Sequence, residues 1–177
     1  MARTKQVALG AMLTALALAL SYMERLIPLQ LLIPLPGIKL GLANLVTVFA
    51  LYTLGTRQTA AILLLRCTLG AAFSSGVSAW LFSITGGVLA LVAMVILRRL
   101  PALSIYGVCL GGAACHNLGQ ILAAALWLHT AYVWAYLPFL LLVSLATGAL
   151  TGFLSARVLQ ILSHGSWRFA KDSGSIR

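Results

Sequence analysis

The chain has 177 residues, of which 62% are hydrophobic and 8% are charged, and its mean hydropathy is +1.04. A soluble domain carries roughly a quarter charged residues, so this composition indicates an integral membrane protein and excludes a soluble globular domain. The formal charge of +10 does not indicate nucleic-acid binding, because the basic residues stand at the ends of apolar runs, where they orient membrane helices. Glu24 and Asp172 are the only acidic residues, which excludes chemistry that needs a carboxylate pair or a carboxylate-held Mg²⁺.

Six apolar runs approach the length of about 20 residues that a membrane-spanning helix needs. We predict helices from about Gln6 to Met23, Ile38 to Leu54, Gln58 to Phe73, Val77 to Leu97, Ala102 to Leu128 and Leu137 to Leu162. The expected fold is therefore an all-α bundle of six transmembrane helices over residues 1–162. The polar, basic segment 163–177 is expected to be a flexible tail.

Basic residues predict the orientation of this bundle. Arg3 and Lys5 precede the first run, Arg57 joins the second to the third, and Arg98-Arg99 join the fourth to the fifth. The connections after the third and fifth runs carry no Lys or Arg, and the connection after the first holds only Arg25, with Lys39 just past its end. Because cytoplasmic connections are enriched in Lys and Arg, we expect both termini to lie in the cytoplasm.

Small residues line one face of the first predicted helix. Ala11, Ala15 and Ala19 recur every four residues, with Ala8 one turn earlier. Residues four apart share a face of a helix, and small side chains let a second helix approach closely. This stripe predicts either packing inside the bundle or docking of a partner subunit, and the pattern does not distinguish the two.

Polar side chains interrupt three of the apolar runs at similar depths. Asn44 lies about 9 Å and Arg66 about 10 Å from the outer ends of their predicted helices, at 1.5 Å per residue. His116 and Gln120 share a face of the fifth helix, with Asn117 beside them, about 12 to 18 Å from its outer end. Taken singly, the histidine could pack against a carbonyl group and the arginine could snorkel to the interface. Together, polar groups from three helices favour a polar cavity.

No catalytic or metal site is expected. The cysteines Cys67, Cys109 and Cys115 lack a CxxC spacing, and we interpret them as small packing residues. Cys115 and His116 are adjacent, so they point about 100° apart on a helix, a poor geometry for chelating a metal ion. The apolar connection from Glu24 to Pro36 contains three prolines, and we expect it to be a lid over the mouth of the bundle or an interfacial segment.

Two sequence motifs resemble a known bacterial family. Pro36-Gly37-Ile38-Lys39-Leu40-Gly41-Leu42-Ala43-Asn44 resembles the first signature of the Gx transporter proteins, a family also named heptaprenyl diphosphate synthase component I. The run from Gly111 to Gln120, which ends in His-Asn-x-x-Gln, resembles the second signature. Glu24 and the residues Ser74, Ser75, Gly76 and Ser78 also match, and the resemblance covers roughly Gln6 to Leu162.

The family is in turn similar to the substrate-binding S components of energy-coupling factor (ECF) transporters. This resemblance implies a non-catalytic, cofactor-free, six-helix subunit of the bacterial cytoplasmic membrane that captures a small molecule on the outer side. It also implies a transmembrane coupling subunit and ATP-binding-cassette ATPases as partners, with the alanine stripe as the docking face. The chain itself has no GxxxxGK[ST] loop. The residues expected to bind the ligand are Glu24, Lys39, Asn44, Arg66, Ser74, Ser75, Ser78, His116, Asn117 and Gln120.

Two alternatives to this function remain. The first is a non-catalytic membrane accessory subunit for polyprenyl diphosphate or quinone synthesis, and the second is a structural membrane module without a ligand. If the chain does bind a ligand, Lys39 and Arg66 place two cations near the expected cavity, and Glu24 is the only outer carboxylate. Because buried charges need compensation, we expect the ligand to carry a carboxylate or a phosphate.

Overall fold

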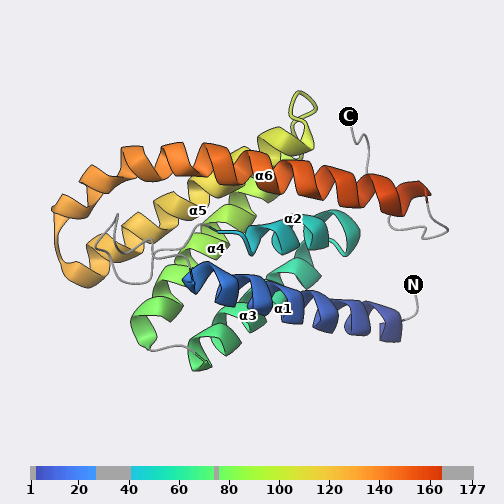
Figure 1. The fold of residues 1–177 in the computed structure, drawn as a ribbon, viewed down its shortest axis with the longest axis horizontal. Helices are drawn as coiled ribbons and strands as arrows, with labels where there is room; N and C mark the ends of the chain where they lie inside the picture. The colour runs from blue at the N-terminus through green and yellow to red at the C-terminus, as the bar shows by residue number, and fades with distance from the viewer. Residues whose placement is uncertain (1–2, 27–40, 74–75, 165–177) are drawn as a thin grey trace.

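The computed structural model of the chain describes residues 3–26, 41–73 and 76–164. Within these ranges the protein is entirely helical. Six α-helices and one 3₁₀ segment follow one another along the chain: α1 (Arg3–Arg25), α2 (Asn44–Thr53), α3 (Thr56–Ala72), α4 (Val77–Leu97), α5 (Ile105–Leu128), η2 (Ala131–Tyr136) and α6 (Leu137–His164). Helices α1 and α6 lie roughly along the long axis of the molecule, whereas α4 and α5 are inclined to it (Figure 1). Helix α1 begins at the same end of the bundle at which α6 ends.

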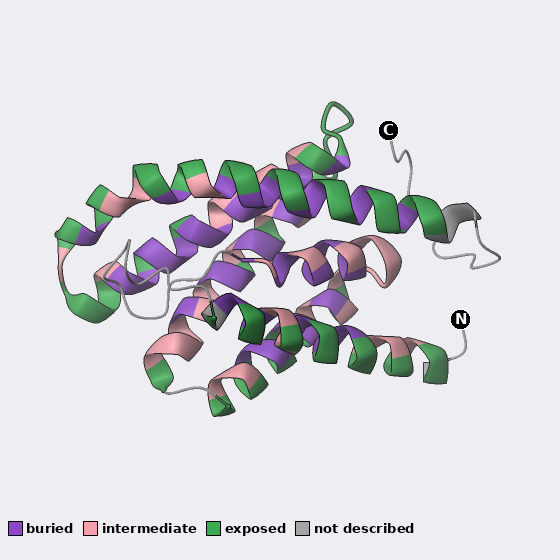
Figure 2. Cartoon of the chain, in the orientation of Figure 1, coloured by how far each residue is buried: buried purple, intermediate pink, exposed green. Residues whose placement is uncertain are grey.

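Four helical stretches in the described part are long and apolar enough to cross a membrane. They are Thr4–Glu24, Val77–Leu97, Ile105–Leu128 and Ala131–Ile161. Their outward faces carry large aliphatic side chains such as Leu142, which is 66% exposed, and Ile161, which is 71% exposed. Burial is correspondingly confined to the inward faces of α1 and α6 (Figure 2). These features fit a multi-pass membrane protein whose outer surface contacts lipid.

Helix α2 is shorter than predicted, and this is the main difference from the expected fold. We predicted a helix from Ile38 to Leu54, but α2 begins at Asn44, and residues 41–43 form a turn. Gly41 has a φ of 83°, which a right-handed helix does not accommodate. With 10 residues, α2 is about 15 Å long, half the thickness of the hydrocarbon core. Residues 38–40 of the predicted helix lie outside the described part of the chain.

The other predicted helices are found, with shifted ends. Helix α4 has the predicted bounds, while α1 is longer at both ends than the predicted Gln6–Met23. The predicted start at Ala102 was wrong by three residues, because α5 begins at Ile105. Pro101 lies in the connection before it, and a proline cannot continue the hydrogen bonding of a preceding helix. Helix α3 runs from Thr56 to Ala72 instead of Gln58 to Phe73, and α6 continues two residues beyond Leu162.

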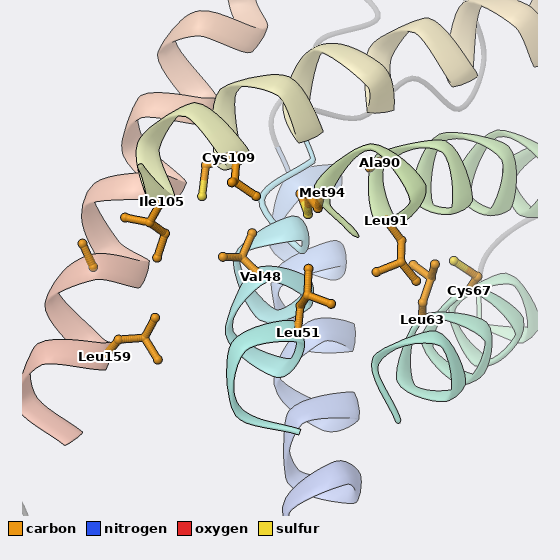
Figure 3. Close-up of a cluster of buried hydrophobic side chains, with 12 residues drawn as sticks. Val48, Leu51, Leu63, Cys67, Ala90, Leu91, Met94, Ile105, Cys109 and Leu159 are labelled. Carbon is orange, nitrogen blue, oxygen red and sulfur yellow. The ribbon is translucent and has the colours of Figure 1, made fainter. Parts of the chain in front are cut away.

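Helix α2 is the centre of the bundle. It packs against each of the other five helices, with α4, α5 and α6 on one side and α1 and α3 on the other (Figure 1). Figure 3 shows the main apolar core around it, where Val48 and Leu51 of α2 meet Leu63 of α3, Met94 of α4 and Leu159 of α6. A second core joins α1, α2 and α3 through residues that include Ala17, Val46 and Ile62. The packing therefore places the N-terminal end of α2 inside the protein.

Hydroxyl groups within the helices are bonded to their own helices. The side chains of Thr59 and Ser83 donate to carbonyls four residues earlier, at 2.8 and 2.7 Å, and Thr147 does the same at 3.1 Å. Such bonds satisfy a polar side chain where no water is present. Several of the remaining polar side chains gather around one cavity.

Candidate functional site

Side chains from four helices surround a small polar cavity. Ser21 and Glu24 come from the end of α1, Arg66 and Cys67 from α3, Ser83 from α4 and His116 from α5, and Gly41 completes the lining just before α2. The free volume of this cavity is about 20 Å³, measured as the space open to the centre of a water-sized sphere. One or two water molecules need about that much space. The site is therefore compact, and it lies among apolar helices where charged groups are costly.

Arg66 is the buried cation of this site. Its residue is 7% exposed, and its Nη2 donates to Oδ1 of Asn44 over 3.4 Å, which links α3 to the first residue of α2. Asn44 was predicted to lie about a turn and a half inside its helix, but it opens α2 instead. The asparagine still reaches the arginine because α2 begins in the interior. The structure therefore brings these two residues into contact, by a geometry different from the one expected.

Glu24 closes the cavity from α1. It is 3% exposed, and its Oε1 accepts a hydrogen bond from the backbone N–H of Leu42. This bond joins the end of α1 to the turn that precedes α2. Glu24 therefore places a carboxyl group in the same cavity as the guanidinium of Arg66.

The polar residues of α5 divide between two roles. The amide nitrogen of Gln120 lies 3.2 Å from Nε2 of His116, as expected for residues four apart on one face. An amide nitrogen can only donate, so Nε2 is the acceptor. Asn117 instead donates from Nδ2 to the carbonyl oxygen of Leu140 over 2.7 Å and joins α5 to α6. Of these three residues, only His116 lines the cavity.

Several residues in the predicted ligand set do not reach the cavity or cannot be placed. Ser78 is half-buried in the first turn of α4 and is not part of the lining. Lys39, Ser74 and Ser75 lie outside the described residues, as does the predicted lid between residues 27 and 36.

Three cavity residues with hydroxyl or thiol side chains were not predicted from the sequence. Ser21 and Ser83 were not singled out, and Cys67 was interpreted as a packing residue, yet all three line it. Ser21 could have been found, because it precedes Glu24 by three residues and therefore shares its face of α1. No comparable sequence spacing predicts that Cys67 and Ser83 lie at the cavity. They meet only through the packing of α3 on α4, where the Cys67 Sγ lies 3.5 Å from the Ser83 carbonyl oxygen.

The alanine stripe faces away from the bundle. Ala8, Ala11, Ala15 and Ala19 are all exposed, whereas Leu13 and Ala17 on the opposite face of α1 are buried. Figure 2 shows this division along α1. Of the two interpretations of the stripe, packing within this bundle is therefore excluded for these residues.

A second hollow is lined by apolar residues and by Ser155. It lies between α1, α2 and α6, and its lining includes Leu16, Phe49 and Val158. Helices α1 and α6 do not pack against each other, so α2 forms its floor. The space open to the centre of a water-sized sphere is about 130 Å³, several times that of the polar cavity. This hollow is suited to hydrocarbon and not to a polar ligand.

Comparison with known proteins identifies one family. A family model described as heptaprenyl diphosphate synthase component I matches residues 13–158, which include both the polar cavity and the apolar hollow. No curated protein matches the chain. No solved structure matches it either.

Proposed function

The chain belongs to the heptaprenyl diphosphate synthase component I family, and from this membership and the geometry of the cavity we propose that it is the substrate-binding membrane subunit of an uptake system. The subunit captures a small molecule with an acidic group on the outer side of the bacterial cytoplasmic membrane, in the manner of the S components of ECF transporters. It is a non-catalytic component that works with other subunits.

The buried polar cavity is the observation that carries this proposal. Four helices bring Glu24, Arg66, His116 and two serines together inside an otherwise apolar bundle. Ionisable groups within membrane helices mark ligand or ion sites more often than structural ones, because burying them costs free energy. A purely structural module has no need of a charged pair in its interior, so the cavity argues against that alternative.

The exposed alanine stripe supports a subunit interface. Small side chains at positions 8, 11, 15 and 19 permit close approach of a helix from another protein, and they lie on the lipid-facing side of α1. In this proposal the coupling transmembrane subunit binds there, and ATP-binding-cassette ATPases bind to the coupling subunit. ATP hydrolysis takes place on those ATPases.

Co-purification from the native membrane tests the proposed function. We expect the tagged full-length chain to retain ATP-binding-cassette ATPases and a coupling protein, and native mass spectrometry to detect a small molecule bound to the detergent-purified subunit. Isolation of the subunit with a soluble prenyl synthase and without the ATPases would contradict the proposal.

The apolar hollow favours a second candidate function, an accessory role in polyprenyl diphosphate synthesis, which the family description names. A hydrocarbon chain could lie between α1 and α6 on the floor that Phe49 forms. Replacing Val158 by Trp would fill this hollow from α6. Loss of association with a prenyl synthase in the Val158→Trp variant, with the polar cavity intact, would favour this second function over the first.

A further inference from the structure

The N-terminal end of α2 points into the interior beside the polar cavity. Its first residue, Asn44, is 3% exposed and hydrogen-bonds to Arg66, which lines the cavity. Its first backbone N–H groups are already used, since Asn44 donates to Gly41 over 2.8 Å and Leu45 donates to Leu42 over 3.0 Å. The helix therefore presents to the site the positive end of its dipole and the side chain of its first residue.

Two buried donors at this point have no partner in the part of the chain that the structure describes. They are Nε of Arg66, in a residue 7% exposed, and Nδ2 of Asn44. Nδ2 lies behind Gly41, since a Cβ added there would stand 3.0 Å from it. Gly41 and Arg66 line the cavity, and Asn44 borders it through these two residues without lining it. Buried donors are almost always paired in native proteins. Both atoms are N–H donors, so the missing group is a hydrogen-bond acceptor.

Two acceptor atoms near the cavity have other partners. The Oε1 atom of Glu24 accepts from the N–H of Leu42, and the Oδ1 atom of Asn44 accepts from Arg66. Within the described residues, the guanidinium of Arg66 is hydrogen-bonded to a neutral amide, and the carboxyl group of Glu24 interacts with it electrostatically without a hydrogen bond. A carboxylate makes shorter and stronger bonds to a guanidinium than a neutral acceptor does.

We propose that the ligand places a carboxylate in this cavity, where Arg66 and Nδ2 of Asn44 donate to its oxygens at the N-terminal end of α2. This inference rests on the proposed ligand-binding function and names the chemical class of the ligand. The space open to the centre of a water-sized sphere is about 20 Å³, and it suits a planar carboxylate of about the size of two water molecules.

Small probes of matched size test the proposal on the detergent-purified full-length chain. Sodium formate is the smallest carboxylate, and formamide is its neutral counterpart of nearly the same shape. We expect formate to raise the unfolding temperature with a saturable dependence on concentration, at an ionic strength held constant with sodium methanesulfonate. Formamide and inorganic phosphate should produce no saturable rise. An equal response to formate and formamide, or a larger response to phosphate, would overturn the proposal.

Substitution of Arg66 tests whether formate binds at this cavity. Arg66→Gln should weaken formate binding at least tenfold, whereas Arg57→Gln, which alters an exposed arginine on the same helix, should bind formate as the unaltered protein does. Formate binding that persists at full strength in a folded Arg66→Gln protein contradicts the proposed site.

A second variant decides the matter even if Arg66→Gln does not fold. Asn44→Asp supplies a carboxylate within reach of Arg66 and at the N-terminal end of α2, and so imitates the bound ligand group. We expect this protein to unfold at a higher temperature than the unaltered one without formate, and to lose its response to formate. A lower unfolding temperature, failure to fold or a retained formate response would each count against the proposal.

The formate experiment and the co-purification experiment can fail separately. A formate response in a chain that binds no ATPases would retain the carboxylate site and remove the transport function. A chain that binds ATPases and retains a small molecule, but does not respond to formate, would retain the function and remove this site.

Discussion

The imidazole ring of His116 lies between two glycines whose missing side chains make room for it. A Cβ at Gly86 would lie 2.9 Å from the His116 carbonyl oxygen and 3.0 Å from its ring, and a Cβ at Gly41 would lie 3.1 Å from Cδ2. Each of these positions is tight for any side chain. The ring is thereby held at the wall of the cavity by α4 on one side and by the turn before α2 on the other.

Gly119 has a similar role about one turn further along α5. A Cβ there would lie 2.8 Å from both the Gly86 Cα and the Thr85 carbonyl oxygen, which are backbone atoms that cannot rotate away. We therefore expect Gly119→Ala to push α5 from α4 and to lower the stability of the protein by about 1–3 kcal/mol. Gly10→Ala is the matched control, because nothing lies within 4 Å of the added Cβ. Thermal unfolding of both variants measures the difference, and equal unfolding temperatures would show that the helices are not in close contact.

Helix α1 has one buried and one exposed face. Leu13 and Ala17, which are 6% and 0% exposed, pack into the core with α2 and α3. The face with the four alanines is exposed along its length (Figure 2). A larger side chain should therefore lower the stability of the fold when it is on the buried face, and should block a partner helix when it is on the exposed face.

Paired leucine substitutions on α1 separate folding from assembly. Ala15→Leu should leave the isolated subunit folded, with its unfolding temperature nearly unchanged, but prevent close approach of a partner helix. Ala17→Leu adds bulk in a filled core and should cost about 1–3 kcal/mol of stability. Co-purification and thermal unfolding measured on both variants distinguish the effects. Normal partner recovery with Ala15→Leu would mean that the interface lies on another helix.

The whole molecule has two dissimilar ends. Helix α1 begins and α6 ends at one end of the molecule (Figure 1). The exposed residue Lys5 lies in the first turn of α1, Arg57 lies in the first turn of α3, and Arg157 lies in the C-terminal part of α6. Exposed aromatic residues occur in and near η2, where Tyr132 is 87% exposed and Trp134 is 41% exposed. Basic residues on the cytoplasmic side and aromatic residues at the interface are typical of a membrane protein. We propose that the basic end faces the cytoplasm.

Reporter fusions test this orientation and the number of spans. A reporter inserted after Arg98, in the connection from α4 to α5, should be cytoplasmic, and one inserted after His129, between α5 and η2, should be on the outer side. Activity of an alkaline phosphatase fusion at each site reports its side, because that enzyme folds only outside the cytoplasm. The same location for both sites would contradict the six-span arrangement.

Local properties of the chain determined the helical class, the bounds of α4 and the face shared by His116 and Gln120. Each of these follows from run length or from the 3.6-residue repeat, which involve residues near one another in the sequence. The scarcity of carboxylates, which excludes a carboxylate-held Mg²⁺ site, is likewise a property of composition alone.

Only the tertiary structure decided where α2 begins, which way the alanine stripe faces and which polar groups meet. Gly41, with its positive φ, begins the turn before α2, and the other five helices pack around that short helix. The bond from Arg66 to Asn44 joins residues 22 apart, and the bond from Leu42 to Glu24 joins residues 18 apart. Such pairings depend on how helices pack against each other, and the periodicity of one helix carries no information about its neighbours.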